Sequence, residues 1–165
     1  MGIYLNPDSD RYERLCNSPI FVDKSLLIEY TNKAINTSND CICVTRPRRF
    51  GKSTDANMLV AYYSKGTNSK DLFNTLNINH CPSFLEHLNK HNVIHLNIQD
   101  FLSTTNSIDE MLSKINRMIL KDLKFEFKDV ITETEIIDAF NEVYAYTKNK
   151  FIFIIDEWDC IFREF

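Results

Sequence analysis

The segment Cys41-Ile42-Cys43-Val44-Thr45-Arg46-Pro47-Arg48-Arg49-Phe50-Gly51-Lys52-Ser53-Thr54 joins an apolar run, a basic loop and a Gly-Lys-Ser triplet, and residues with helical spacing follow it. This layout is typical of a phosphate-binding loop, in which a buried strand anchors the loop and backbone N–H groups turn inward on the phosphates. Such a loop also needs a lysine for the β- and γ-phosphates and a hydroxyl for Mg²⁺ at the positive end of a helix. Gly51, Lys52 and Ser53 meet these needs, and we expect 41–45 to be the anchoring strand.

The loop departs from the usual G-x-x-x-x-G-K-[ST] pattern at its first position, where Arg46 replaces glycine. Arginine adopts positive φ only at a cost, so the first turn of the loop must differ from the common one, and Pro47 biases Arg46 towards an extended backbone. On its own such a match is often fortuitous, and an exposed basic turn is the alternative. We predict that the nucleotide-binding residues are Arg48, Arg49, Phe50, Gly51, Lys52, Ser53 and Thr54.

A second motif stands near the end of the chain, in Phe151-Ile152-Phe153-Ile154-Ile155-Asp156-Glu157-Trp158-Asp159. Five apolar residues in a row suit a strand buried in a parallel sheet, and two carboxylates follow at its carboxyl end, where α/β sheets bind ligands. This is the form of a Walker B element, in which Asp156 holds Mg²⁺ through water and Glu157 polarises the attacking water. A core strand with solvated acids is the alternative, but both motifs in this order favour the site. Asp159 is expected to cap a terminal helix and is the alternative base.

Three strings of residues carry a family resemblance: Phe21-Val22-Asp23-Lys24-Ser25, Arg46-Pro47-Arg48-Arg49-Phe50-Gly51-Lys52-Ser53 and Ile155-Asp156-Glu157-Trp158-Asp159. The chain resembles the AAA-ATPase-like family, with Trp158 at a position where members usually have tyrosine. The resemblance implies an N-terminal P-loop ATPase domain that uses ATP and Mg²⁺, often followed by a PD-(D/E)XK nuclease-like domain. It also makes Phe21, Val22 and Asp23 candidates for the adenine pocket, although a helix-entry staple is an equal alternative.

Composition narrows the class of partner. With 165 residues and 44% apolar content, one domain with a core is expected. The net charge of −4 does not suggest nucleic-acid binding, so we expect nucleic acid only through a C-terminal domain outside this chain. We expect a nucleotide as partner and no membrane association, and we leave oligomerisation open. Five cysteines without a C-x-x-C pair favour a reducing cytoplasm.

The pattern along the chain predicts an α/β fold of the P-loop NTPase type, a three-layer sandwich with a mainly parallel sheet. We divide it into a lead-in segment with a helix, 1–40, and an ATPase core, 41–165. Beside the strand over 41–45, strands are expected over 92–98 and 151–155. Helices are expected over 26–35 with Ser25 as N-cap, 53–64 ending at Gly66, 83–91, 108–124 with Ser107 as N-cap, and 133–147. His87 and His91 lie four residues apart on one of these helices, but no third ligand supports a zinc site.

The resemblance implies the sheet order five-one-four-three-two. The chain stops after its third strand, so we expect strands four and five to be absent, the sheet to be incomplete at the C-terminus, and the fragment to have little activity. Strands 41–45 and 151–155 would then face a gap of one strand, whereas direct pairing between them would indicate a GTPase-like order. We predict Mg-dependent ATP hydrolysis. The alternative is a nucleotide-binding switch that regulates a downstream nuclease-like domain.

Overall fold

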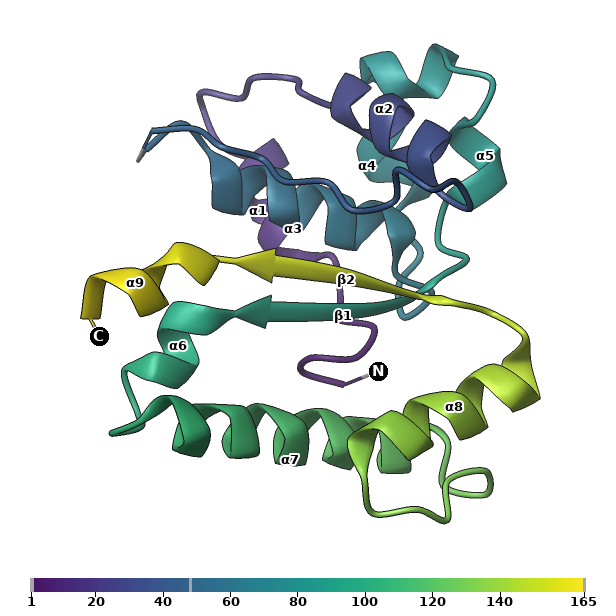
Figure 1. The fold of residues 1–165 in the computed structure, drawn as a ribbon. Helices are drawn as coiled ribbons and strands as arrows, with labels where there is room; N and C mark the ends of the chain where they lie inside the picture. The colour runs from purple at the N-terminus through teal and green to yellow at the C-terminus, as the bar shows by residue number, and fades with distance from the viewer. Residues whose placement is uncertain (1, 48, 165) are drawn as a thin grey trace. The chain divides into compact units, whose positions relative to one another are not determined.

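The computed structural model describes residues 2–47 and 49–164 of a mixed α/β chain in which about half of the residues are helical (Figure 1). The chain forms two compact units, which are described separately. One combines Met1–Pro7 with His91–Phe165 and holds the sheet, and the other is Asp8–Lys90. The predicted division into 1–40 and 41–165 follows the positions of the motifs, not the packing, and it stays a prediction.

The sheet consists of two parallel strands, β1 (Asn92–Asn97) and β2 (Phe151–Asp156), with Asn92 opposite Phe151 and Asn97 opposite Asp156. The strands predicted over 92–98 and 151–155 are therefore confirmed, and their parallel pairing agrees with the implied adjacency of the second and third strands. The amino-terminal residues add an antiparallel bridge between Leu5 and Ile94. Both strands end at the same edge of the sheet, where Figure 1 shows α6 and α9.

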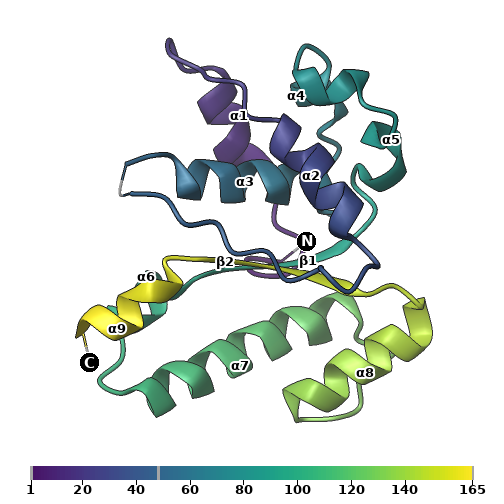
Figure 2. The ribbon, with the colours of Figure 1, turned by 45° about the horizontal axis from the view of Figure 1, so that its top comes forward.

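Helices α7 (Ile108–Glu126) and α8 (Ile136–Thr147) lie along one face of this sheet, as Figures 1 and 2 both show. A stripe of α7 with helical spacing is buried in the core of this unit: Met111, Ile115, Ile119 and Leu123. The Ser107 hydroxyl caps α7 by accepting the Glu110 N–H at 3.2 Å. The predicted helices 108–124 and 133–147 are confirmed, with shifted ends. Three short elements complete the unit: α6 (Ile98–Leu102), the 3₁₀ helix η2 (Trp158–Cys160) and α9 (Ile161–Glu164).

The Asp8–Lys90 unit is helical. Its elements are α1 (Asp10–Cys16), α2 (Leu26–Ala34), α3 (Lys52–Tyr63), α4 (Lys70–Phe73), the 3₁₀ helix η1 (Asn77–His80) and α5 (Phe84–His87). An aromatic cluster forms its core. The Phe73 ring stacks on Tyr12 at 5.3 Å between centroids and meets Tyr62 edge-on at 5.7 Å. The predicted helices 26–35 and 53–64 are confirmed as α2 and α3 to within one residue at each end.

The predicted strand over 41–45 is wrong. Residues 41–47 are irregular and exposed, and Ile42 and Val44 each leave about 40% of their surface in solvent. A strand exists only through pairing with a neighbour, and a local apolar run does not supply one. The three-layer sandwich is therefore not what the described residues show; they show the two-stranded sheet alone.

Of three smaller predictions about helix ends, two are wrong and one holds only in part. The helix expected over 83–91 stops at His87, because Asn89 has a left-handed backbone and its amide group is hydrogen-bonded to the Ala61 and Ser64 carbonyls. Ser25 stands at the N-cap position of α2 as predicted, but among the described residues its hydroxyl accepts no N–H of this helix and instead accepts the Ile78 N–H at 3.0 Å. Gly66 is not the left-handed glycine of a helix end; α3 ends at Tyr63. No helix in the described part of the chain is both long enough and apolar enough to span a bilayer.

Candidate functional site

The Gly-Lys-Ser triplet lies where a long helix begins. Gly51 occupies the N-cap position of α3 with φ 82° and ψ 26°, and its carbonyl accepts the Asp55 N–H at 2.9 Å. Such a backbone strongly favours glycine, which explains why one of the three glycines in the chain stands here. Lys52 is the first helical residue, and Ser53 and Thr54 follow it in the first turn.

The first turn of α3 offers backbone donors to an anion. Within residues 2–47 and 49–164, no side chain caps this helix. The first N–H groups of a helix have no carbonyl partner inside it, and the helix dipole makes this end positive. A phosphate group satisfies both conditions, so the start of α3 has the donor set that a polyphosphate requires.

The lysine of the motif lies against its own loop. Lys52 Nζ donates a hydrogen bond to the Arg46 carbonyl at 2.7 Å. This bond joins the two ends of the predicted loop. The left-handed residues in the described part of the loop are Arg49, with φ 69°, and Gly51. Arg46 is not among them, so the first turn differs from the common loop as the sequence predicted.

The remaining loop residues are accessible. Arg49 and Ser53 are exposed, Thr54 is half-buried, and Phe50 leaves 62% of its surface in solvent. Arg48, which we also predicted to bind nucleotide, lies outside the described residues.

A lysine far away in the sequence also reaches the loop. Lys24 Nζ donates to the Phe50 carbonyl at 2.9 Å and lies 3.2 Å from an Asp55 carboxylate oxygen. A Cβ atom added to Gly51 would come within 2.7 Å of Lys24 Nζ, so this side chain also uses the space that glycine leaves. The sequence reasoning missed Lys24. The signal was its place between Asp23 and Ser25 in a string that resembles the family.

The second motif gives two adjacent carboxylates at the end of β2. Asp156 is buried, stands opposite Asn97 of β1, and accepts the Glu157 N–H at 2.9 Å through Oδ1. Glu157 has a left-handed backbone with φ 54° and ψ 30°, which is uncommon for a residue with a side chain. Backbone strain of this kind concentrates at functional sites. The predicted N-cap role of Asp159 is wrong, because this residue lies inside η2.

The two predicted magnesium ligands, Ser53 and Asp156, carry oxygen donors. Among the described residues, Asp156 forms no salt bridge, and no cluster of three or more His, Cys, Asp or Glu side chains could hold a metal ion. Mg²⁺ usually keeps several waters and takes one or two protein oxygens together with phosphate oxygens. Asp156 and Ser53 each carry an oxygen of the kind that Mg²⁺ takes.

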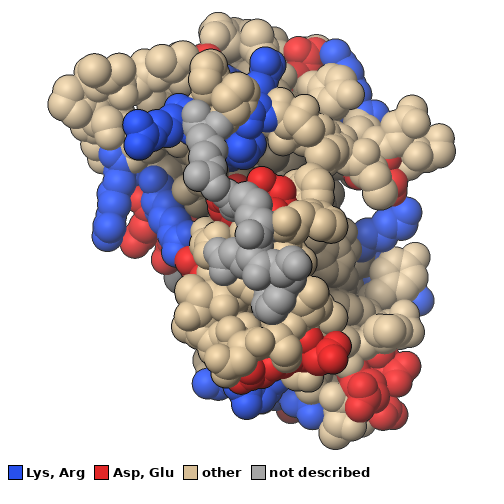
Figure 3. All heavy atoms as spheres, turned by 60° about the vertical axis from the view of Figure 1, so that its left-hand side comes forward, with Lys and Arg blue, Asp and Glu red and all other residues tan. Residues whose placement is uncertain are grey.

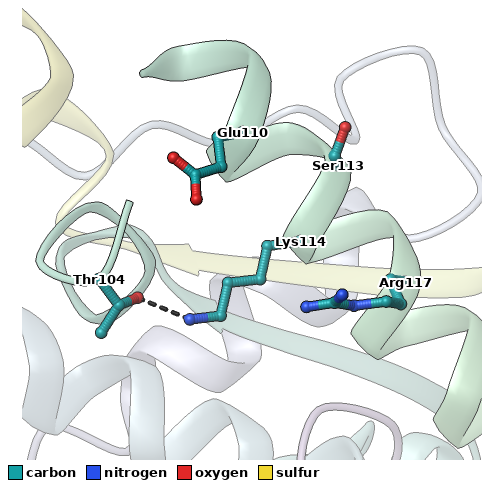
Figure 4. A pocket seen from close by; sticks show the side chains of 5 residues that line it. All are labelled: Thr104, Glu110, Ser113, Lys114 and Arg117. Carbon is teal, nitrogen blue, oxygen red and sulfur yellow. Dashed lines mark hydrogen bonds between the residues drawn. The ribbon is translucent and has the colours of Figure 1, made fainter. Parts of the chain in front are cut away.

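The surface carries charged side chains and one open pocket. Figure 3 shows one face of the molecule, which carries both basic and acidic side chains among uncharged surface. Figure 4 shows an open pocket beside α7, lined by Thr104, Glu110, Ser113, Lys114 and Arg117. Lys114 Nζ donates to the Thr104 hydroxyl at 2.7 Å across this pocket. None of the predicted site residues lines it.

Comparison with known families identifies the chain. A family model described as "Predicted AAA-ATPase" matches residues 10–164. The chain belongs to the AAA-ATPase-like family. The match covers the loop before α3, the segment that holds Lys24, and the carboxylates of Asp156 and Glu157. Membership indicates nucleotide binding in general. Comparisons with curated proteins and with solved structures gave no match.

Proposed function

We propose that this AAA-ATPase-like chain binds ATP through the loop that precedes α3 and hydrolyses it with Mg²⁺. The observation that carries the proposal is Gly51 at the uncapped start of α3, with Lys52 lying on its own loop. We further propose a P-loop NTPase-type sandwich, supported by the parallel pairing of β1 with β2 and by the helices on one face of the sheet.

The loop residues have separate tasks in this proposal. Lys52 exchanges the Arg46 carbonyl for the β- and γ-phosphates, since a phosphate is a stronger partner for an ammonium group than a neutral carbonyl. The N–H groups of the first turn of α3 donate to the same phosphates. Arg49, an exposed residue of the same loop, adds positive charge. Arg48 is proposed for the same role from its place in the motif.

The carboxylates supply the chemistry. When bound, Mg²⁺ neutralises the charge that develops on the phosphate oxygens. Ser53 and Asp156 are the residues that would hold it. Glu157 orients the attacking water and takes its proton, the task of a positioned general base. The residues that bind the phosphates lie in Asp8–Lys90, and the carboxylates lie in the other compact unit.

Binding is tested first. Lys52→Met removes the charge but keeps a chain of similar length, and we expect ATP affinity to fall by about ten- to a hundredfold, the worth of a charge-assisted contact. Lys70→Met is the control, because Lys70 is an exposed lysine of the same unit and lies in α4, outside the loop. Affinity is measured by titrating a fluorescent ATP analogue. Equal affinity of the Lys52 and Lys70 variants would remove Lys52 from the site.

Hydrolysis separates the proposal from its alternative. Glu157→Gln should bind ATP normally and release phosphate roughly 10²–10⁴-fold more slowly, the contribution of a positioned base. If the wild type binds ATP but releases no more phosphate than this variant, the chain is a nucleotide-binding switch, as expected for a regulator of a nuclease-like domain.

A further inference from the structure

We propose that Lys24 is a positioning residue of the phosphate-binding loop, which holds the Phe50 carbonyl and thereby aims the Gly51 N–H at the nucleotide. The inference rests on the proposed function, because it assigns to that N–H a phosphate as its partner. It assigns no contact between Lys24 and the nucleotide.

The geometry of one peptide bond carries the first step. The carbonyl and the N–H of a planar trans peptide point in opposite directions. Lys24 Nζ holds the Phe50 oxygen at 2.9 Å, so the direction of the Gly51 N–H is fixed as well. Gly51 has no side chain and would otherwise adopt many backbone conformations. A peptide held at its oxygen keeps the donor oriented before the ligand arrives.

The same ammonium group ties the loop to the helix. Its second partner is Asp55, in the first turn of α3, at 3.2 Å. The Asp55 side chain is 14% exposed. Its Oδ1 atom accepts no hydrogen bond from the described residues, so the positive charge of Lys24, 3.2 Å away, compensates the buried negative charge. Because the Asp55 N–H also bonds to the Gly51 carbonyl, Lys24 and the helix hold the loop end at two adjacent carbonyls.

The backbone on either side of Lys24 is fixed by hydrogen bonds of its two sequence neighbours, Asp23 and Ser25. The Asp23 carboxylate accepts the Ser25 N–H at 2.7 Å and, from Asn77, both the backbone N–H at 2.8 Å and the side-chain amide at 2.7 Å. The Ser25 hydroxyl accepts the Ile78 N–H at 3.0 Å. Burial alone would raise the pKa of Asp23, but these hydrogen bonds outweigh it and the pKa is lowered. Two anchors on η1 therefore fix the backbone from which Lys24 extends.

The test compares three variants. Lys24→Met removes the donor, and Lys24→Arg keeps a charged donor. Lys33→Met is the matched control, because Lys33 lies in the same unit and forms an ion pair with Glu29 at 2.7 Å. The Lys33 side chain is more exposed than that of Lys24. We expect Lys24→Met to weaken ATP and ADP binding equally, by about three- to tenfold. Lys24→Arg should restore most of this loss, and Lys33→Met should change neither affinity.

Two readouts distinguish positioning from other roles. A loss at least fivefold larger for ATP than for ADP would mean a direct contact with the γ-phosphate, and it would overturn the inference. Lys24→Met should lower the unfolding midpoint, because it leaves the Asp55 carboxylate, 14% exposed, without its cation, and Lys24→Arg should restore the midpoint. A fall in midpoint that Lys24→Arg does not restore would also overturn it, because Lys24 would then serve the fold and not the loop.

A third measurement does not depend on nucleotide. Hydrogen exchange of the Asp55 amide, which is bonded to the Gly51 carbonyl, should be faster in Lys24→Met than in Lys33→Met without any ligand. Unchanged exchange would overturn the hold of Lys24 on the loop. If the wild type binds neither ATP nor ADP, the proposed function fails while this comparison still decides what Lys24 does.

Discussion

The backbone of Glu157 gives the sharpest test of the carboxylate site. With φ 54° and ψ 30°, this residue adopts a left-handed conformation, which costs an L-residue about 1–2 kcal/mol. Glycine avoids that cost but loses more chain entropy on folding, about 0.5–1 kcal/mol relative to alanine. We therefore expect Glu157→Gly to be more stable than Glu157→Ala by about 0.5–1 kcal/mol.

The comparison between these two variants isolates the backbone. Both lose the carboxylate, together with whatever that side chain contacts. Both keep the two hydrogen bonds of the main chain, from Glu157 N–H to Asp156 and from Cys160 N–H to the Glu157 carbonyl. The difference in unfolding free energy, measured by urea denaturation at pH 7, is then the preference of position 157 for glycine.

The control for this test is a helical position in the same unit. Lys121 is exposed within α7, where alanine is favoured over glycine by about 1 kcal/mol. Lys121→Gly should therefore be less stable than Lys121→Ala, the opposite order from Glu157. If glycine is the less stable choice at both positions, Glu157 is not held left-handed. A retained phosphate-release rate in Glu157→Gly would show that its carboxylate is not the base.

The remaining predictions concern the unit that carries the phosphate-binding loop. Tyr63→Phe should lower the stability of this unit by about 1–2 kcal/mol, because the buried hydroxyl bonds to Asn32 at 2.7 Å and to Thr31 at 2.6 Å. Tyr30→Phe, at an exposed position of α2, should change the stability by less than about 0.5 kcal/mol. Asp23→Asn should lower the urea midpoint by more at pH 7 than at pH 3. The folded-state pKa of Asp23 is lowered, so its contribution is present above the unfolded pKa near 4 and is lost as the pH falls through the folded value; an equal deficit at both pH values would contradict this account.

The parts of the fold that could be predicted are those with local signals. The apolar stripe and the Ser107 cap suffice for α7, and the run that ends in Asp156 suffices for β2. The segment 41–45 has a similar apolar character but no neighbour to pair with among the described residues, and pairing is not a local property. Asn89 ended the helix expected over 83–91 through hydrogen bonds to α3, which a sequence pattern does not contain.

The candidate site divides in the same way. Gly51 and Lys52 could be predicted because their roles depend on adjacent residues at one helix start. Lys24 could not, because its two partners lie 26 and 31 positions further along the chain and meet it only after folding. The left-handed backbone of Glu157 also escaped prediction, since glutamate seldom adopts it and nothing in the motif demands it.

These observations separate the strength of nucleotide binding from the rate of hydrolysis. The loop donors are held by Lys24 and by the first turn of α3, all within Asp8–Lys90. The carboxylates of Asp156 and Glu157 stand at the end of β2 in the other unit. Changes at Lys24 should therefore act on affinity, and changes at Glu157 on turnover. An ATPase and a nucleotide switch would bind ATP through the same loop, so affinity cannot distinguish them; the carboxylate at 157 can.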